Sequence, residues 1–409
     1  FEILTSAAAV LRDRADEFVD ALTVEAGKPR KASIVEVDRS IETLQWSAEE
    51  AKRIAGEAFG LDASPSGVGR FAITLRQPVG VVAAITPSNS PLNLVAHKVG
   101  PALAGGNAVV LKPPQVTPVC SLMLREVFQE AGLPDGFFSV VVGPEAGEAL
   151  LTDSGVDFYN FTGSVDVGLH LRRTIGLRRA LLELGGNSPV IVHADADIAR
   201  AAVACAAKGF AHAGQACTSV QRIYVHRSIA SDFLKALVAA TEALQVGDPD
   251  DSATDLGPMI ALSAASRLHQ RIEDAVHAGA RRLTGGERVG PVLWPTILVD
   301  VPDDAAIRCE EAFGPVIVVD QYEDVEAALQ AANSTPYGLH AAIFTASLQV
   351  AFRAIERLEA GAVLVNEATQ WRTEFVPFGG VKLSGSGREG PKYAVEEMTQ
   401  LKLAMLNLT

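Results

Sequence analysis

The sequence predicts an α/β protein made of two successive α/β domains. Short apolar runs alternate with amphipathic helical segments, and this alternation starts again after Pro189. Runs that are apolar at nearly every residue are typical of strands buried on both faces of a parallel sheet. With 409 residues, the chain is long enough for two such domains, each with a large core, and a cleft between them.

The first domain is predicted from two helical segments and five apolar strands. Apolar residues recur at three- and four-residue steps from Leu4 to Leu22, and Gly27 and Pro29 end this helical pattern. Thr117-Pro118 opens another helix, which ends at Gly132. The predicted strands are 81–85, 108–111, 138–142, 158–161 and 180–184.

The second domain repeats this alternation. No internal repeat and no low-complexity linker separates it from the first domain. Its predicted strands lie near Val190, Ile223 and Val316, and its predicted helices lie near Ile198, Ile229, Leu268 and Val325.

Composition excludes several classes of function. Hydrophobic residues make up 48% of the chain and charged residues 21%, as in ordinary globular enzymes rather than disordered chains. The formal net charge of −14 argues against nucleic-acid binding, because phosphates would be repelled. No stretch has the roughly 20 uninterrupted apolar residues of a membrane span. Four scattered cysteines form neither a disulfide framework nor a Cys-x-x-Cys metal site, so we expect a cytoplasmic protein without a metal.

An acid and a thiol, each framed by glycines, are the strongest indication of function. Glu183 lies in Leu-Glu-Leu-Gly-Gly-Asn-Ser-Pro, and Cys217 lies in Gly-Gln-Ala-Cys-Thr-Ser. An acid buried in an apolar strand is costly without a role, whereas cysteines such as Cys120 and Cys205 are usually small core residues. Cys217 differs because its neighbours form a polar loop. A carboxylate that activates water and a thiol that forms a covalent intermediate can oxidise an aldehyde through a thioester.

Further motifs occur in a fixed order around this pair. Phe161-Thr-Gly-Ser-Val-Asp-Val-Gly168 precedes the acid, and its N–H groups at a helix N-terminus suit a pyrophosphate. The other motifs are 85–91, 105–114, 310–316, 333–339 and 377–385. Over nearly its whole length the chain therefore resembles the aldehyde dehydrogenase superfamily. The resemblance is to hydrolytic, NAD(P)-dependent members such as semialdehyde, lactaldehyde and phosphonoacetaldehyde dehydrogenases.

The resemblance implies a catalytic set and a cofactor set. Cys217 attacks the aldehyde, the Asn89 amide and the Cys217 backbone N–H stabilise the oxyanion, and Glu183 activates the hydrolytic water. On the residues alone, Asn89 is equally well explained as an Asx-turn residue. The expected cofactor is NAD or NADP, and Lys112 ends a strand, where open α/β sheets bind ligands. The expected cofactor-binding residues are Ile85, Lys112, Gln115, Gly163, Ser164, Gly168, Glu311 and Phe313.

The chain departs from the usual family pattern at three positions. Gln115 stands where NAD-dependent members carry a glutamate, and an amide does not repel the 2′-phosphate of NADP, so either cofactor fits. Ser88 replaces a tryptophan, which either widens the substrate tunnel or leaves room for a polar substrate. Arg372 matches an arginine of members that oxidise aldehydes with anionic tails, although Ala216 replaces the second arginine that some of them carry. A solvated surface arginine is the alternative explanation for Arg372.

The resemblance also divides the chain into three parts and implies a homodimer or homotetramer. The expected fold is aldehyde dehydrogenase-like, with two doubly wound α/β domains and a small β oligomerisation element. Residues 1–66 and 78–185 are expected to bind NAD(P), and residues 186–384 form the catalytic domain. A hairpin over 67–77 and the segment 385–409 form the oligomerisation element. Since the chain begins inside a helix and without Met, we expect a truncated or edited sequence.

Three alternative interpretations compete with this assignment. Gly385-Ser-Gly387-Arg-Glu-Gly390 matches a dinucleotide fingerprint, but it lies near the C-terminus and outside a βαβ unit, so a structural turn is expected. A CoA-acylating relative would pass the thioester to coenzyme A, but such enzymes commonly lack the acid at Glu183. A non-catalytic structural family member is the third, and the intact Cys217, Glu183 and Asn89 argue against it.

Overall fold

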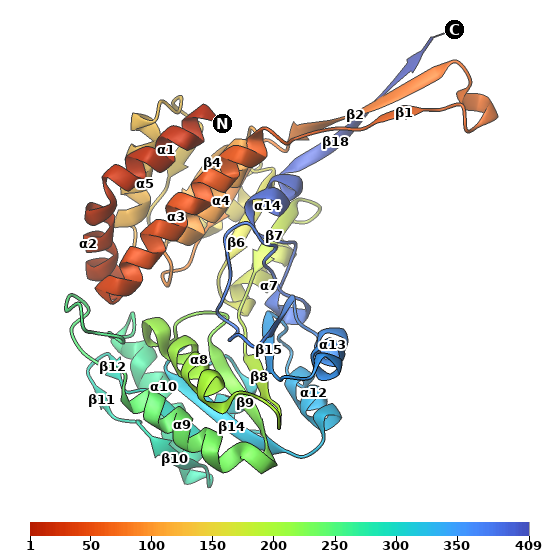
Figure 1. Cartoon of the computed structure of the whole chain (residues 1–409). Coiled ribbons are helices and arrows are strands. Elements are labelled where there is room, and N and C mark those ends of the chain that lie inside the picture. The colour runs from red at the N-terminus through yellow and green to blue at the C-terminus, as the bar shows by residue number, and fades with distance from the viewer. Residues whose placement is uncertain (409) are drawn as a thin grey trace.

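Two α/β units lie next to each other, and a thin β arm extends from the first unit (Figure 1). The computed structural model describes residues 1–408, and the last residue of the predicted segment 385–409 lies outside it. Within the described residues, every helix is too short or too polar to cross a bilayer. No group of three or more His, Cys, Asp and Glu side chains in this part of the chain is arranged to hold a metal ion.

The first unit is a six-stranded sheet covered by helices on both faces. Its strands are β3 (Val81–Ile85), β4 (Ala108–Lys112), β5 (Phe138–Val140), β6 (Phe158–Thr162), β7 (Arg179–Glu183) and β17 (Gly385–Ser386). Its helices are α1 (Glu2–Asp13), α2 (Ala15–Ala26), α3 (Arg30–Ala51), α4 (Asn93–Ala104), α5 (Val119–Glu130), α6 (Ala146–Thr152), α7 (Val165–Thr174) and α14 (Pro391–Glu397). The apolar stripes of α1 to α5 and α14 pack in one core, and those of α6 and α7 pack in another. The strand order is β17-β7-β6-β3-β4-β5, and only β17 runs antiparallel to its neighbour.

The second unit is a seven-stranded sheet with the same layered construction. Its strands are β8 (Ser188–Val192), β9 (Val220–His226), β10 (Arg281–Thr284), β13 (Thr296–Val299), β14 (Val316–Tyr322), β15 (His340–Phe344) and β16 (Ala362–Val365). Its helices are α8 (Ile198–Phe210), α9 (Ala230–Glu242), α10 (Leu262–His277), α11 (Ala306–Cys309), α12 (Val325–Asn333) and α13 (Leu348–Arg357). Helices α8 to α10 pack in one core, and α12 and α13 pack in the other. The order is β10-β13-β14-β9-β8-β15-β16, in which only β10 is antiparallel.

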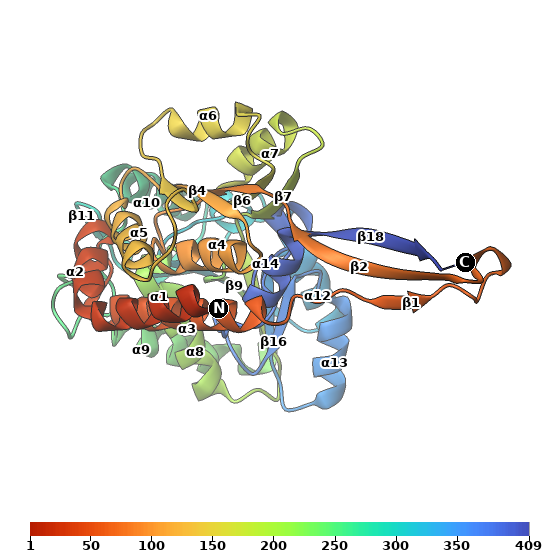
Figure 2. The same ribbon diagram turned by 90° about the horizontal axis from the view of Figure 1, so that it is seen from above.

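Three antiparallel strands form the arm that extends from the first unit (Figure 2). They are β1 (Ala58–Gly60), β2 (Arg70–Pro78) and β18 (Thr399–Asn407), with β2 in the middle. A short hairpin of β11 (Arg288–Val289) and β12 (Val292–Leu293) and the 3-10 turns η1 (Pro65–Gly67), η2 (Ala211–Gly214), η3 (Arg227–Ile229) and η4 (Lys382–Ser384) complete the structure. The arm exposes large apolar side chains: Phe71, Leu75, Leu401, Leu403, Met405 and Leu406.

The structure confirms the predicted α/β fold class but corrects three details. The helical stripe from Leu4 to Leu22 belongs to two helices, because the backbone of Arg14 leaves the helical conformation between α1 and α2. The predicted hairpin over 67–77 is mostly the single strand β2, and its hairpin partner is β1, which precedes it. Residues 385–397 of the expected oligomerisation element lie with the first unit instead, since β17 pairs with β7 and α14 packs on α3 and α4.

Candidate active site

A cavity of about 310 Å³ lies where the two units meet. The first unit contributes the loops that follow β3, β6 and β7, and the second contributes the loops that precede β9 and β14. Open parallel sheets bind ligands at the carboxyl ends of their strands, and the first unit presents that edge here. The lining residues are Pro87, Asn89, Leu94, Thr162, Gly163, Ser164, Leu184, Gly185, Cys217, Glu311 and Phe313.

Cys217 lies in a tight turn between η2 and β9. His212 and Ala213, within η2, have positive φ angles of 49° and 53°, a left-handed conformation that non-glycine residues rarely adopt. The turn also packs closely on the glycines that follow β7. A Cβ atom on Gly186 would lie 2.2 Å from the carbonyl oxygen of Cys217. Gly186 is therefore needed for the close approach of the two loops.

The environment of Cys217 favours the neutral thiol. Burial raises its pKa above the usual range, and the nearby carboxylates of Glu311 and Glu183 raise it further. The positive charge of Arg372 acts in the opposite direction. Since the thiolate is the nucleophilic form, the reaction requires a group that takes up the proton.

Glu183 ends β7 and is 2% exposed. Burial raises its pKa well above the usual range, and the carboxylate of Glu389 raises it further. Neither carboxyl oxygen has a hydrogen-bond partner among the described residues. A buried carboxyl group in these surroundings is stable as the neutral acid and becomes a strong base when it ionises.

Beside Glu183 lies a buried ion pair that sequence reasoning missed. Lys98 on α4 contacts Glu389 at 2.9 Å, between Nζ and Oε1, and its Nζ also donates to Oδ1 of Asn160 at 2.8 Å. Both charged side chains are fully buried. Burial alone would raise the pKa of Glu389, but Lys98 holds it below the usual range. In the sequence, the only indication of this pair was a lysine within the otherwise apolar segment of α4. Glu389 lies in the glycine-rich segment 385–390, which was expected to be a structural turn.

Asn89 lies in the loop after β3 and reaches across to the nucleophile loop. Its Nδ2 donates to the carbonyl oxygen of Gln215 at 2.9 Å. The side chain of Gln215 is itself fixed, because its Oε1 accepts from the backbone N–H of Ile260 at 2.8 Å. The Asn89 amide is thus held close to the loop that carries Cys217, and both residues line the cavity.

The expected cofactor residues gather at the carboxyl edge of the first sheet. Ile85 ends β3, Lys112 ends β4, and Gln115 is exposed in the following turn. Burial lowers the pKa of Lys112. Ser164 caps α7 by accepting from the backbone N–H of Val167 at 3.4 Å, so the first turn of this helix opens toward the cavity.

These residues fit a dinucleotide. A Cβ atom on Gly163 would lie 2.5 Å from the Phe161 ring, so glycine allows this ring to pack against the backbone beside the helix N-terminus, where phosphate binds. Glu311 accepts from the backbone N–H of Gly186 at 2.9 Å, and burial raises its pKa to about 7. Phe313, with a positive φ of 45°, lines the same cavity. Four expected cofactor residues do not line this cavity: Ile85, Lys112, Gln115 and Gly168, the last of which is buried inside α7.

Arg372 lies in the loop after β16, and its side chain is 9% exposed. It is therefore not a solvated surface arginine. Its guanidinium stacks over the Phe378 ring at 4.1 Å, and its Nη2 lies 2.8 Å from Nε2 of His97. Its Nε is buried without a partner among the described residues. Arg372 does not line the 310 Å³ cavity, but its charge acts on both Cys217 and Glu183.

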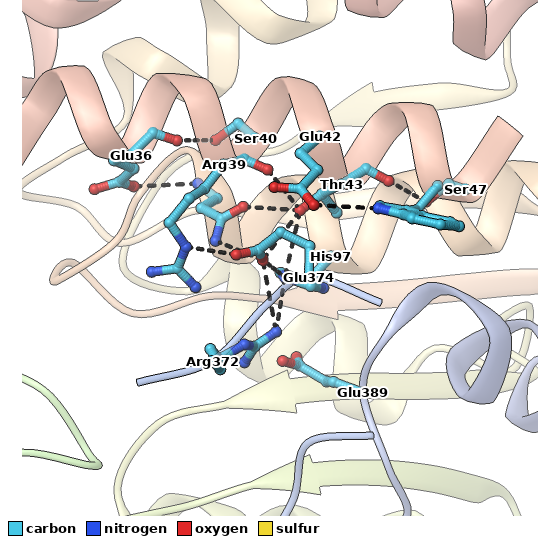
Figure 3. Close-up of polar contacts among 12 residues, drawn as sticks. Glu36, Arg39, Ser40, Glu42, Thr43, Ser47, His97, Arg372, Glu374 and Glu389 are labelled. Atoms are coloured by element: carbon cyan, nitrogen blue, oxygen red, sulfur yellow. Dashed lines mark hydrogen bonds and ion pairs between the residues drawn. The ribbon is translucent and has the colours of Figure 1, made fainter. Parts of the chain in front are cut away.

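A second polar network missed from the sequence surrounds Arg372 (Figure 3). Glu374, 1% exposed, contacts His97 and accepts from Nε of Arg39. It also accepts from Nδ2 of Asn93 at 3.3 Å. Burial alone would raise the pKa of Glu374, but its contacts with His97 and the two arginines lower it far below the usual range. The carboxylate is therefore ionised at every ordinary pH.

These features together define a class of protein. A thiol, an amide donor and a helix N-terminus meet in one cavity between two α/β units, and the buried acid Glu183 directly precedes the lining residues Leu184 and Gly185. This arrangement is that of a nucleotide-dependent oxidoreductase with a covalent intermediate.

The comparisons with known proteins give the family. The aldehyde dehydrogenase family model matches residues 1–404, and the chain belongs to this family of NAD(P)-dependent oxidoreductases. The 3-sulfolactaldehyde dehydrogenase of Priestia megaterium is 48% identical over 100% of this chain and 86% of its own length.

Two solved structures extend the comparison. Aldehyde dehydrogenase 21 from Physcomitrella patens, solved with the reaction product succinate, superposes with a TM-score of 0.96 at 39% identity, over 100% of this chain and 85% of that one. A glyceraldehyde-3-phosphate dehydrogenase from Methanocaldococcus jannaschii, complexed with NADP, superposes with a TM-score of 0.95 at 38% identity, over 99% of this chain and 89% of that one.

Proposed function

We propose that this enzyme oxidises a short aldehyde with an anionic tail to the carboxylic acid, through a thioester on Cys217. The observation that carries the substrate class is the buried guanidinium of Arg372, whose Nη2 contacts His97 and whose Nε is an unused donor. The overall reaction consumes the aldehyde, water and NAD(P)⁺ and yields the acid, NAD(P)H and a proton.

The first step is attack of Cys217 on the aldehyde carbon. Glu183, once ionised, takes up the thiol proton, because burial raises the pKa of both groups and makes the carboxylate a strong base. The new carbon–sulfur bond leaves a negative charge on the former carbonyl oxygen. The side-chain amide of Asn89 and the backbone N–H of Cys217 are the proposed donors to this oxygen.

Oxidation and hydrolysis follow at the same carbon. NAD(P), when bound by the residues around Gly163, Ser164 and Glu311, supplies the acceptor for the hydride. Glu183 first releases the thiol proton to solvent, then takes a proton from the water that attacks the thioester, and returns this proton to Cys217 as the sulfur leaves. The Lys98–Glu389 pair keeps the buried surroundings of Glu183 electrically balanced.

Charge balance supports an anionic tail. Lys98 and Glu389 neutralise each other, and Glu183 is stable as the neutral acid. In the network around Arg372 itself, Arg39 and Arg372 face Glu374, which leaves one positive charge in excess there. A single anionic group on the substrate would compensate it. The relatives agree in chemistry, since 3-sulfolactaldehyde carries a sulfonate and succinate carries a second carboxylate.

The assembly and the location are part of the proposal. The apolar side chains on the arm of β1, β2 and β18 support a homodimer or homotetramer, because exposed patches of this kind usually mark interaction surfaces. The four cysteines are free, which supports a reducing, cytoplasmic environment. Light scattering after gel filtration measures the oligomeric state, and a monomer would contradict the first of these two inferences.

One assay tests the proposed function. The formation of NADH and NADPH is measured with 3-sulfolactaldehyde and with lactaldehyde, which has the same carbon chain without the sulfonate. We expect a higher kcat/KM for 3-sulfolactaldehyde and no requirement for coenzyme A. Cys217→Ala is the control and should lose at least about a thousandfold in turnover. A strict requirement for coenzyme A would favour the acylating alternative, and no turnover of either aldehyde by the wild type would contradict the proposal.

A further inference from the structure

Gln221 is a buried glutamine on the strand that follows the nucleophile turn. It is the second residue of β9, lies four residues after Cys217 and is 5% exposed. The strand around it is buried along nearly its whole length. An amide in such a place is costly unless its polar atoms are hydrogen-bonded. The partners of this amide therefore show what it stabilises.

The amide of Gln221 bridges the two peptide groups on either side of Glu311. Its Nε2 donates to the carbonyl oxygen of Glu310 at 2.7 Å and lies 3.5 Å from that of Ile307. Its Oε1 accepts from the backbone N–H of Ala312 at 3.0 Å. A side-chain amide offers a donor and an acceptor side by side, which a carboxylate or an ammonium group does not. One side chain thus holds the backbone both before and after Glu311.

The backbone of β9 is irregular at this residue. The pairing of β8 with β9 shifts by one residue between Ser188 and Pro189, whose partners are Val220 and Arg222. Gln221 is therefore an extra residue on β9 without a partner on β8, as in a β-bulge. Bulges redirect a side chain and are common next to active sites. Here the redirected amide reaches the segment that precedes β14.

Glu311 extends from this segment into the cavity, where its carboxyl group has little freedom. One oxygen accepts from the backbone N–H of Gly186 at 2.9 Å. A Cβ atom on Gly185 would lie 2.6 Å from the other oxygen, so the carboxyl group packs closely on the loop after β7. A shift of the Glu311 backbone would therefore break this contact and move the carboxyl group within the cavity.

Two further side chains hold the same segment, but each of them reaches a carbonyl group only. Asn187 donates to the carbonyl oxygen of Glu310 at 3.3 Å, and Arg271 donates to that of Glu311 at 3.2 Å. The N–H of Ala312 is bonded by Gln221. Loss of the Gln221 amide should therefore loosen the segment without releasing it.

The nucleophile turn has anchors of its own, which do not depend on Gln221. The carbonyl oxygen of Thr218 accepts from Oγ1 of Thr369 at 2.7 Å. The hydroxyl of Ser219 donates to the carbonyl oxygen of Gly209 at 2.8 Å. Loss of the amide should thus affect the segment before β14 and leave the nucleophile in place.

We propose that Gln221 is a positioning residue that fixes the carboxylate of Glu311 relative to Cys217, an inference that rests on the proposed function. In that function Glu311 contacts the bound nucleotide, and Cys217 carries the substrate carbon that loses the hydride. Hydride transfer requires both to be held in register, since a misplacement of about 1 Å can cost about a hundredfold in rate. Strand β9 meets this requirement, because it starts directly after the nucleophile turn and its second side chain holds the Glu311 segment.

Titration calorimetry with NADPH and with NADH tests this role without turnover. Gln221→Met keeps the length of the side chain but loses both hydrogen bonds, so the Kd of the nucleotide should rise about three- to tenfold. Gln221→Glu keeps the acceptor but loses the donor, and it should also bind more weakly. Thermal unfolding checks that the variants are folded. Gln321→Met, at an exposed position on β14, is the matched control and should bind like the wild type. A wild-type Kd in the folded Gln221 variants would overturn the inference.

Hydrolysis of p-nitrophenyl acetate distinguishes this role from a merely structural one. The ester acylates a thiol directly and releases p-nitrophenolate, and water then releases acetate, so the reaction needs Cys217 but no nucleotide. In the absence of nucleotide, both Gln221 variants should hydrolyse the ester within about twofold of the wild-type rate. Cys217→Ala should lose this activity. A loss of ester hydrolysis as large as the loss of nucleotide affinity would indicate general damage to the site and would contradict the inference.

A double-mutant cycle shows whether Gln221 acts through Glu311. Gln221→Met should raise the Kd much less in a Glu311→Gln background than in the wild type, because the group that it positions is already altered. Equal increases in both backgrounds would contradict the inference. The cycle also separates the inference from the proposed function. If Glu311→Gln does not weaken nucleotide binding, the cofactor role of Glu311 and the inference both fail. If it does, but Gln221→Met does not, only the inference fails.

Discussion

The side-chain amide of Asn89 donates to the backbone carbonyl of Gln215 at 2.9 Å, two residues before Cys217. This contact connects the loop after β3 in the first unit with the nucleophile loop of the second. It uses one of the two N–H groups of the amide, so the other can serve the oxyanion. This hydrogen bond between the units thus helps to position Asn89, the proposed oxyanion donor, relative to Cys217, the proposed nucleophile.

Asn89→Ala should lower kcat with a smaller effect on KM. Loss of one oxyanion donor typically costs about 10²–10³ in kcat, since the donor acts where charge develops. Asn89→Asp keeps the size of the side chain but replaces the donor by an acceptor, so it should be at least as slow. Steady-state kinetics measure both variants. A normal kcat in Asn89→Asp would exclude the amide as an oxyanion donor.

Glu183→Gln should separate the oxidation of the aldehyde from the hydrolysis of the thioester. The amide cannot take a proton from water, so hydrolysis should slow by about 10²–10⁴. Rapid mixing should still show a burst of NAD(P)H if another group or the solvent accepts the thiol proton. An equal loss of burst and steady state would assign Glu183 to the activation of Cys217 alone.

Hydrolysis of the thioester should become faster as pH rises through the raised pKa of Glu183, because only the carboxylate can act as a base. The neighbouring carboxylate of Glu389 contributes to that raised pKa. Glu389→Gln removes this negative charge and should move the rise to lower pH. The exposed Glu396 on α14 provides the control, and Glu396→Gln should leave the profile in place. Decay of the acyl-enzyme is followed from about pH 5 to about pH 9, and a profile that Glu389→Gln does not move would contradict the assigned coupling.

The fold could be predicted where the sequence carries a local pattern. The strands of the first sheet are continuous apolar runs, and the structure has them close to the predicted positions. The pairing of β2 with β1 could not be predicted, because β1 is a three-residue, fully exposed strand without an alternating pattern. The same holds for β17, whose two residues, Gly385 and Ser386, join the first sheet from the far end of the chain.

The site could be predicted only in part for a related reason. Asn89 and Cys217 stand in distinctive motifs, and the structure brings them to one cavity. Lys98 and Glu389 are 291 residues apart, and their contact leaves no trace in a single sequence. His97 and Glu374 are 277 residues apart, so their network was equally invisible. Local motifs indicate the candidate reacting groups. The residues whose charges shift the pKa values of those groups come from distant segments of the chain.

Gln115→Glu should shift the cofactor preference toward NAD. The added carboxylate would repel the 2′-phosphate of NADP and accept hydrogen bonds from the ribose of NAD. A contact with a charged group is worth about 1.5–3 kcal/mol, so the ratio of kcat/KM values should change by roughly ten- to a hundredfold. Gln129→Glu, at an exposed position on α5, adds the same charge elsewhere and serves as the control. An equal shift in both variants would show that the ribose is bound by other residues.

Arg372→Lys and Arg372→Ala test how the anionic tail is bound. Lysine keeps the positive charge but loses the planar fork that pairs with an oxyanion at two points, so it should rescue the alanine variant only in part. In Arg372→Ala, kcat/KM for 3-sulfolactaldehyde should fall by roughly ten- to a hundredfold, because one charge-assisted contact contributes about 1.5–3 kcal/mol. The effect on lactaldehyde should be much smaller, since this aldehyde has no charged tail.

The order of the kcat/KM values of the wild type, Arg372→Lys and Arg372→Ala is as informative as the size of the loss in either variant. If charge alone attracts the substrate, the lysine variant should equal the wild type and lose its advantage at high salt, because exposed charges are screened. If the fork binds the sulfonate directly in a buried site, the order should be wild type, then lysine, then alanine, with little dependence on salt. Thermal unfolding of each variant checks that the loss of stacking on Phe378 at 4.1 Å has not unfolded the loop. Equal losses for both aldehydes in a folded Arg372→Ala would contradict the anionic-tail assignment and leave Arg372 a structural role in its network with His97 and Glu374.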